Sequence, residues 1–239
     1  MQMGYSLLNG SKNLLNVFKI ARYRRKFKKE HPLYFNPSGL LVFCGPQGAG
    51  KTLSAVQYVR ELSFMYPNAI LCTNTYIKGL HKKMKVVEYE GLQSLTDIEN
   101  GYNGVIYFID EIHLEFNSLE SKNIPIEVMV EISQQRKQRK HIVGTSQQFL
   151  RMAKPLREQV KNLVICKNFF GCIQYNMLID GSTIHEDNGH IKMDIKKKSL
   201  WFHTPELYDS YDTYAKMKRY RKDWQGTSKP TVFYEEERK

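Results

Sequence analysis

The chain has 239 residues, and its content of 41% hydrophobic and 25% charged residues is typical of a globular protein. Its formal net charge of +12 favours a polyanionic partner, either nucleic acid or an anionic membrane surface. No stretch is apolar enough to cross a bilayer, no signal peptide is recognisable and the four cysteines form no C-x-x-C pair, which excludes membrane-spanning and disulfide-stabilised secreted proteins. We therefore expect a cytoplasmic protein with buried thiols, peripheral to a membrane at most.

Residues 1–37 are predicted to form a basic helix followed by a linker. Five apolar residues share one helical face: Leu7, Leu8, Leu14, Leu15 and Phe18. Seven cations follow between residues 19 and 29, and Pro32 and Pro37 then break the helix. Such a helix can lie on anionic lipid, grip DNA or pack on a neighbouring subunit, and it can equally be a solvated tail.

The next unit, residues 38–168, is organised around a complete phosphate-binding loop. Its G-x-x-x-x-G-K-T pattern lies between an apolar strand predicted over residues 40–44 and a helix predicted over residues 52–65. The glycines let successive backbone N–H groups point at an anion, and the helix dipole adds positive charge at the same place. We therefore predict that ATP is bound by Gly45, Pro46, Gln47, Gly48, Ala49, Gly50, Lys51, Thr52 and Leu53.

Further elements are predicted between this loop and a pair of carboxylates. Residues 69–73 read as a second buried strand, and residues 79–103 as a polar, irregular region with a short helix near residues 92–99. The apolar run 104–109 reads as a central parallel strand that is covered on both faces. It ends in Asp110-Glu111, about sixty residues after the loop, and this combination is a strong signal for nucleotide hydrolysis.

Each polar side chain at these two motifs has an expected role. Lys51 supplies a mobile charge for the outer phosphates, while the Thr52 hydroxyl and the Asp110 carboxylate hold Mg²⁺. Glu111 is placed to orient and deprotonate a water molecule that attacks the γ-phosphate. The alternative, two carboxylates in a solvated turn at a strand end, is disfavoured by the complete phosphate loop upstream.

The rest of this unit is predicted to alternate between helix and strand. Helices are expected over residues 125–139 and 149–160, and strands over residues 141–145 and 162–166. The first of these helices should present one face formed by Ile126, Met129, Val130 and Ser133. Its C-terminal end should carry four cations: Arg136, Lys137, Arg139 and Lys140.

Two kinds of side chain in this region have a predicted catalytic role. Gln147 follows a strand and is expected to sense the γ-phosphate or the attacking water, although it can also cap the next helix. Arg136 and Arg139 are expected to reach into the site of a neighbouring subunit, with Arg157 as the reserve candidate. Local salt bridging is the alternative for all three arginines.

Beyond residue 168 the pattern becomes antiparallel. Alternating apolar residues and two glycine turns predict a β-hairpin appendage over residues 169–200. Residues 201–239 are predicted to form a C-terminal helix, starting at Thr204-Pro205, and a basic tail. The helix should carry a stripe formed by Tyr208, Tyr211, Tyr214 and Met217. This stripe, with the cations after it, can stack on single-stranded nucleic acid, but packing is the favoured interpretation.

Several of these motifs occur in the same order as in a known family. They are the phosphate loop, Cys72-Thr73-Asn74 with Gly79-Leu80, Ile109-Asp110-Glu111, Gly144-Thr145-Ser146-Gln147 and Lys154-Pro155-Leu156-Arg157. Over residues 38–168 the chain therefore resembles the zonular-occludens-toxin-like P-loop ATPases of filamentous phages, within the FtsK–HerA superfamily of DNA-pumping and packaging ATPases. The resemblance implies a RecA-like fold, a homo-oligomeric ring, an arginine finger from a neighbouring subunit, and DNA movement driven by ATP.

The predicted fold class is α/β: a RecA-like P-loop NTPase core with a central parallel sheet flanked by helices, a small antiparallel β appendage and a C-terminal helix. The filamentous-phage proteins usually carry a membrane-spanning segment after the ATPase core, and its absence here favours genome packaging into a preformed shell. We expect ATP and Mg²⁺ as ligands and DNA, bound without sequence specificity, as partner. Capsid proteins or membrane-associated assembly proteins are the further expected partners.

Three other functions stay open. An assembly or extrusion ATPase of the filamentous-phage kind, or a conjugation ATPase, would use the same core. A non-hydrolysing nucleotide-binding scaffold would use the basic segments for binding alone. A small-molecule kinase shares the loop, but such enzymes generally need no water-activating glutamate, so Glu111 argues against that class.

Overall fold

The computed structural model describes residues 10–187 and 190–211, and the chain divides into two compact units, residues 1–34 and 35–239. The first unit contains the helix α1 (Gly10–Glu30), which confirms the helix predicted there, although Leu7 and Leu8 lie outside the described residues. Aromatic contacts link the C-terminal end of this helix to the residues that follow it: the Phe27 ring lies 4.7 Å from that of His31 and 5.0 Å from that of Tyr34. No helix of the described part has the length and hydrophobicity that a membrane crossing needs.

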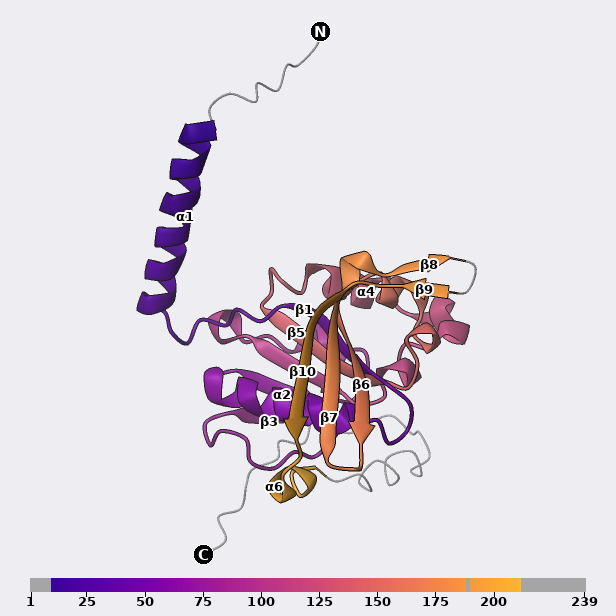
Figure 1. The fold of residues 1–239 in the computed structure, drawn as a ribbon. Coiled ribbons are helices and arrows are strands. Elements are labelled where there is room, and N and C mark those ends of the chain that lie inside the picture. The colour runs from indigo at the N-terminus through magenta and orange to yellow at the C-terminus, as the bar shows by residue number, and fades with distance from the viewer. Residues whose placement is uncertain (1–9, 188–189, 212–239) are drawn as a thin grey trace, which may run out of the picture. The chain divides into compact units, whose positions relative to one another are not determined.

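The second unit is built on one eight-stranded sheet with the order β10-β7-β6-β1-β5-β4-β2-β3 (Figure 1). The strands are β1 (Gly39–Cys44), β2 (Ile70–Thr73), β3 (Lys85–Glu88), β4 (Val105–Ile109), β5 (Lys140–Ser146), β6 (Val160–Phe169), β7 (Ile173–Asp180) and β10 (Ile195–Phe202). Strands β1 to β6 are parallel, whereas β7 and β10 are antiparallel to their neighbours. A small separate hairpin pairs β8 (His185–Asp187) with β9 (His190–Lys192).

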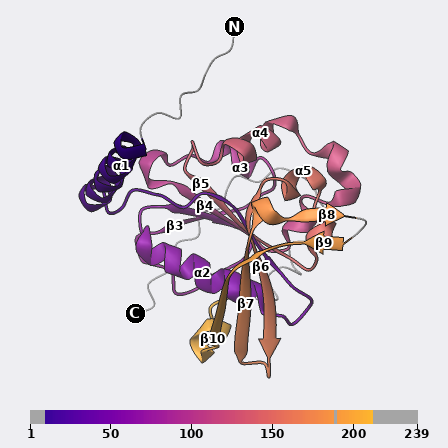
Figure 2. The same ribbon diagram turned by 45° about the horizontal axis from the view of Figure 1, so that its top comes forward.

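Helices cover both faces of the parallel part of the sheet, as Figures 1 and 2 show. On one face, α2 (Lys51–Met65) packs Leu53, Val56 and Val59 into a buried cluster with side chains of β1 and β2. The other face is covered by α3 (Ser94–Asp97), α4 (Ile126–Gln134), α5 (Lys154–Arg157) and short 3-10 turns. This arrangement confirms the predicted α/β fold with a central parallel sheet, since the strands buried on both faces are the continuous apolar runs.

The antiparallel strands predicted beyond residue 168 join the central sheet directly. The long strand β6 pairs with β1 along one edge and with β7 along the other, so β7 and β10 extend the same sheet. The short helix α6 (Pro205–Tyr208) follows β10, and it begins at the predicted position. The predicted stripe is wrong at Tyr211, which forms an isolated bridge with Ile77 instead of continuing the helix; Tyr214 and Met217 lie outside the described residues.

Two predicted helices are shorter in the structure. The helix expected over residues 125–139 ends at Gln134, Arg139 adopts a left-handed conformation with φ 54°, and Lys140 begins β5 as a buried partner of Glu131. Its buried face consists of Val128 and Ile132, not of the predicted set. Val128 and Ile132, four residues apart, lie on the helix face that packs against the sheet, whereas the predicted Ile126 and Val130 are exposed.

The region expected to form a helix over residues 149–160 is broken. A 3-10 turn, Phe149–Arg151, is followed by the extended residue Met152, and the single turn α5 begins only at Lys154. Pro155 occupies the first turn of this new helix, where a backbone N–H would have no acceptor within the helix, so the missing proline N–H costs no hydrogen bond. The structure also contains an edge strand, β3, within a region predicted to be irregular, because its sequence KVVE has too few apolar residues to indicate a strand.

The predicted burial of the cysteines is correct for Cys44, Cys72 and Cys166 and wrong for Cys172, which is exposed beside the turn between β6 and β7. Burial raises the pKa of the Cys166 thiol to about 12 and that of Cys44 still higher. Both thiols therefore stay neutral, so neither places a negative charge beside the predicted phosphate loop.

A buried histidine in the sheet gives a testable pH dependence of stability. The His141 Nδ1 lies 2.8 Å from the Gly39 carbonyl oxygen and its Nε2 lies 3.0 Å from the Tyr58 hydroxyl, and burial lowers the pKa of the imidazole from 6.5 to about 4. The unfolded chain binds this proton at a higher pH than the folded chain does. The stability that the neutral, buried His141 contributes is therefore fully present above pH 6.5 and is lost as the pH falls towards about 4. We expect a loss of about 3 kcal/mol.

Denaturant unfolding of the wild type and of His141→Gln between pH 4.5 and 7 measures this effect. The variant should lose the part of the pH slope that His141 provides, while His185→Gln, which changes an exposed histidine, should keep it. An identical slope in all three proteins would show that His141 does not titrate in this way.

Candidate phosphate-binding site

The phosphate loop connects the carboxyl end of β1 to the first residue of α2. Gly48 and Gly50 adopt left-handed conformations with φ of 78° and 75°, which only glycine adopts without strain. The Gly45 N–H donates to the Ser146 carbonyl at 3.3 Å, and the Ser54 N–H donates to the Gly50 carbonyl at 2.9 Å. The loop is thereby anchored to β5 on one side and to the first turn of a 15-residue helix on the other, and the positive end of the helix dipole lies at the loop.

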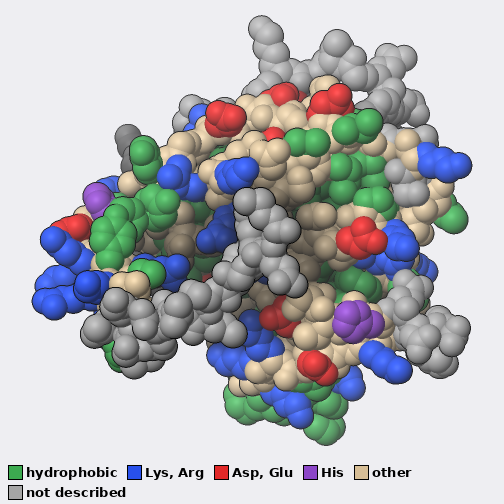
Figure 3. Space-filling model, turned by 90° about the horizontal axis from the view of Figure 1, so that it is seen from above, with side chains coloured by type: hydrophobic (Ala, Val, Ile, Leu, Met, Phe, Trp, Pro, Cys, Tyr) green, Lys and Arg blue, Asp and Glu red, His purple; other side chains and the backbone are tan. Residues whose placement is uncertain are grey.

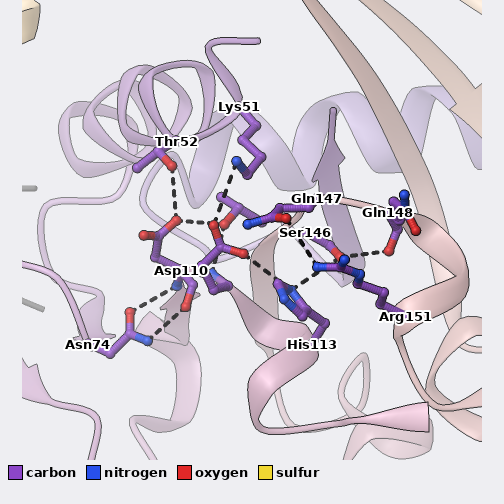
Figure 4. Close-up of polar contacts among 11 residues, drawn as sticks. Lys51, Thr52, Asn74, Asp110, His113, Ser146, Gln147, Gln148 and Arg151 are labelled. Carbon is purple, nitrogen blue, oxygen red and sulfur yellow. Dashed lines mark hydrogen bonds and ion pairs between the residues drawn. The ribbon is translucent and has the colours of Figure 1, made fainter. Parts of the chain in front are cut away.

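Asp110 lies at the carboxyl end of β4, directly opposite the loop (Figure 4). Its Oδ1 accepts hydrogen bonds from the Thr52 hydroxyl at 3.0 Å and from the Thr145 hydroxyl at 2.6 Å. The Asn74 side chain brackets the backbone of the same residue, accepting from its N–H at 2.9 Å and donating to its carbonyl at 3.0 Å. The carboxylate and the Thr52 hydroxyl are thus held together as the oxygen pair that Mg²⁺ requires, and the residues present fit that ion.

Glu111 adopts a strained backbone conformation beside this pair. Its φ is 56°, in the left-handed region that a side chain of this size rarely adopts, and its N–H donates to the Thr145 hydroxyl at 2.8 Å. The carboxylate Oε1 lies 3.6 Å from the Lys51 Nζ, and Oε2 lies 3.3 Å from the His113 Nδ1. Oε2 is buried and accepts no hydrogen bond within the described residues.

Polar residues at the end of β5 complete the same edge of the sheet. The Gln147 Oε1 accepts from the Arg151 guanidinium at 3.1 Å, and the Ser146 hydroxyl lies 3.4 Å from the His113 Nδ1. Figure 4 draws these side chains around the strand ends, with Lys51 and Thr52 reaching in from the loop. The arrangement follows from the parallel sheet, in which the carboxyl ends of neighbouring strands meet at one edge.

Arg136 and Arg139 lie at the other edge of the sheet, where β5 begins. The Arg139 guanidinium lies 4.4 Å from the centre of the Tyr102 ring and donates to the Gly101 carbonyl at 3.4 Å. The structure therefore does not bring these two arginines to the phosphate loop of their own chain. Arg157, in α5, lies 5.9 Å from the centre of the Phe149 ring.

A buried glutamine from the antiparallel part of the sheet supports the loop from below. Gln174 in β7 is fully buried, and its Nε2 donates to the Ala49 carbonyl at 3.0 Å and to the Asn176 Oδ1 at 2.8 Å. A Cβ atom at Gly50 would come within 2.0 Å of the Gln174 Oε1. His203, just after β10, contacts the same oxygen through its Nε2 at 3.2 Å.

Five residues with clear contacts at the site had no predicted role: Asn74, His113, Thr145, Arg151 and Gln174. Asn74 and Thr145 follow or end parallel strands, so the strand-end rule that identified Asp110 could have found both. His113 and Arg151 lie three and four residues after predicted site residues, and their spacing carries no specific signal. Gln174 belongs to an antiparallel strand far along the chain, and only the sheet order brings it to the loop.

No protein-family model matches the chain, and no curated protein matches its sequence. The N-terminal domain of zonular occludens toxin from Neisseria meningitidis has a similar structure, with a TM-score of 0.53 at 18% identity, over 74% of this chain and 100% of that domain. The genome packaging NTPase B204 from Sulfolobus turreted icosahedral virus 2, in complex with ATP-gammaS, gives a TM-score of 0.47 at 12% identity, over 66% and 97% of the two chains. The DNA-packaging ATPase B204 from Sulfolobus Turreted Icosahedral Virus gives 0.46 at 12% identity, over the same shares.

At these identities the similarity concerns the fold. The toxin domain is matched over its whole length, and this agrees with the RecA-like P-loop fold that the sequence motifs predicted.

Proposed function

We propose that the chain is an ATPase of the viral genome-packaging kind, a motor that moves nucleic acid. The observation that supports this best is the position of Asp110 and Glu111, which follow one strand and face Thr52 and Lys51 of the phosphate loop. A loop that only bound phosphate would need no second carboxylate here. Glu111 is the residue that favours hydrolysis by water over transfer to another acceptor.

Each residue has a role in binding and hydrolysis that follows from its contacts. The backbone N–H groups of Gly48 and of residues 50–52 bind the phosphates, since the Ala49 N–H already donates to the Pro46 carbonyl at 3.1 Å, and Lys51 balances the charge of the outer phosphates. Mg²⁺, held by the Thr52 hydroxyl and the Asp110 carboxylate, would draw charge from the phosphate oxygens. Asn74 and Thr145 fix Asp110 so that this carboxylate does not have to reorganise.

Glu111 takes the proton from the attacking water. Its Oε1 lies 3.6 Å from the Lys51 Nζ, beside which the last phosphate would lie, while its Oε2 faces His113. The water oxygen forms a bond to the γ-phosphorus as the bond to the β–γ bridging oxygen breaks, and the proton passes to the carboxylate. Gln147 can hold the same water, and Arg151 orients this amide.

The test of the proposed function is a measurement of ATP turnover. We expect Mg²⁺-dependent hydrolysis that is stimulated by DNA irrespective of its sequence, and DNA binding that weakens steeply with salt because phosphates are the contacts. Hydrolysis without any effect of duplex or single-stranded DNA at low salt would refute the motor and leave an ATPase. ATP binding without hydrolysis would refute both and indicate a nucleotide-binding scaffold.

Gln174 is predicted to set the affinity for ATP. Gln174→Ala removes the hydrogen bond to the Ala49 carbonyl and opens space beneath Gly50, so the loop loses its fixed shape. We expect the KM for ATP to rise about fivefold to tenfold with a smaller change in kcat, which is the effect of about one lost buried hydrogen bond. Gln57→Ala, on the solvent side of α2, is the control. An unchanged KM in a folded Gln174→Ala protein would show that this contact has no such role.

An arginine from a neighbouring subunit is predicted to assist hydrolysis. Arg136, Arg139 and Arg157 remain the candidates for this role, whereas Arg151 contacts Gln147 of its own chain. Loss of such an arginine should lower kcat by about a thousandfold. Each arginine-to-alanine variant is mixed with Lys51→Ala, and partial recovery of turnover identifies the arginine that acts between subunits. If no mixture regains activity although the two proteins co-assemble, the arginine acts within its own chain or not at all.

A further inference from the structure

Among the described residues, no helix covers the lower part of the sheet face opposite α2, where β6, β7 and β10 run side by side. Gln174 and Asn176 of β7 point to α2 and the phosphate loop, as their contacts with Ala49 and Ser54 show. Tyr175 and Ile173 must therefore point to the opposite face. Strand register places two rows on that face: Lys167, Tyr175 and Leu200 in one, and Phe169, Ile173 and Phe202 in the next.

This surface, which we name the open face, consists of Lys167, Phe169, Tyr175, Lys198, Leu200 and Phe202. Its upper neighbours Leu163 and Ile179 are buried in the hydrophobic cluster under α4 and α5. Below them the cover ends, and 46% of Phe169, 60% of Leu200 and 65% of Phe202 are exposed. Figure 1 shows β10, β7 and β6 in front of α2, with no described helix before their lower halves.

The turn that joins β6 to β7, next to this surface in sequence, contains one more aromatic residue. Phe170 is 94% exposed and adopts a left-handed conformation with φ 54°, which is strained for a large side chain. Solvent exposure of so large a ring in a strained position gives no benefit to folding. Such positions are typical of binding surfaces.

The charge of these strands is one-sided. Together β6, β7 and β10 contain five lysines and one carboxylate, Asp180, which pairs with Lys196 at 3.3 Å. Within the described residues no carboxylate contacts Lys167 or Lys198. The side of the molecule with these strands forms the lower margin of Figure 3, where hydrophobic side chains gather with Lys or Arg side chains among them.

We propose that the open face binds a strand of unpaired nucleic acid. Exposed aromatic rings stack on bases and lysines contact the phosphates between them, which is the chemistry of sequence-tolerant single-strand binding. A duplex fits less well because its base faces are covered by stacking. A second copy of this chain is disfavoured as the occupant, since a protein with a net charge of +12 offers little negative surface to these lysines.

This inference goes beyond the proposed function, which needs a nucleic-acid partner but does not place it. The open face and the phosphate loop lie on opposite sides of β7, because Ile173 and Tyr175 flank Gln174, which contacts the loop. Binding at the face and binding at the loop can nevertheless be measured separately.

The experiment measures the affinity of the full chain for fluorescent 20-nucleotide strands of dT and of U and for a 20-base-pair duplex. Phe202→Ser and Lys198→Glu alter the face, whereas Phe64→Ser and Lys82→Glu make the same changes at exposed positions on α2 and after it. We expect the single strands to bind more tightly than the duplex, and Phe202→Ser to weaken their binding about tenfold. Lys198→Glu should also lower the salt dependence, by about 0.7 in the log–log slope for the phosphate lost.

Tight binding of either dT or U supports the proposal, and their ratio shows whether DNA or RNA is preferred. ATP turnover without oligonucleotide, measured on the same preparations, should be the same in both face variants, so a failed ATPase cannot be mistaken for a failed face. Equal binding by face and control variants, or tighter binding of the duplex than of the single strands, would overturn the proposal. A change in the sedimentation of Phe202→Ser with unchanged oligonucleotide binding would overturn it too, and would identify the face as a contact between subunits.

Discussion

Glu111→Gln should retain ATP binding and lose turnover by about a hundredfold or more, the effect expected for removal of a general base. The variant keeps the size and the hydrogen-bonding reach of the side chain, and its backbone N–H still has the Thr145 hydroxyl as partner. What it loses is the carboxylate oxygen that takes the proton from water. Binding of ATP and single-turnover hydrolysis, both measured on one preparation, separate the two effects.

The control for this variant is Glu127→Gln, which makes the same change at an exposed position in the first turn of α4. It should hydrolyse ATP as the wild type does. If Glu111→Gln also turns over at a near-normal rate, Glu111 is not the base, and its strained backbone then serves the ion pair with Lys51 alone.

The parts of the fold that the sequence predicts are those in which local pattern and burial agree. Strands β1 and β4 are apolar throughout and buried on both faces, so their continuous runs leave no other interpretation. The phosphate loop needs glycines at positions with positive φ, and Gly48 and Gly50 occupy such positions. Asp110 was found because a carboxylate directly after a buried strand must lie at the edge where the loop also lies.

The parts that could not be predicted depend on tertiary contacts. The helix expected to reach Arg139 ends five residues earlier because Lys140 is needed in the buried start of β5, where it pairs with Glu131 and donates to the Leu95 carbonyl. The buried face of this helix was also predicted wrongly, because only packing against the sheet decides that Val128 and Ile132 are the buried residues. Gln174 shows the limit for the site, because its role exists only through the pairing of β7 with β6.

Lys51→Ala should abolish detectable binding of ATP. It should also lower the stability of the ligand-free protein, because Lys51 neutralises the Glu111 carboxylate there. Lys51 is 7% exposed, and its Nζ lies 3.6 Å from the Glu111 Oε1, while the His113 Nδ1 lies 3.3 Å from the other oxygen of this carboxylate. Removal of the ammonium group deletes the charge that the outer phosphates need. It also leaves a carboxylate in a poorly solvated site with a weaker partner, at a cost of about 1–3 kcal/mol in stability.

Thermal unfolding with and without Mg²⁺ and ATP distinguishes these two losses. At a ligand concentration of 100 times its Kd the wild type should gain about 2.7 kcal/mol, and Lys51→Ala should gain nothing. The double variant Lys51→Ala, Glu111→Gln should recover the stability that Lys51→Ala loses, because no carboxylate is then left without its partner, yet it should still not respond to ATP. Lys82→Ala, at an exposed position, should behave as the wild type. A normal response to ATP in Lys51→Ala would place the nucleotide elsewhere than on the phosphate loop, and with it the roles assigned to Thr52, Asp110 and Glu111 would fail.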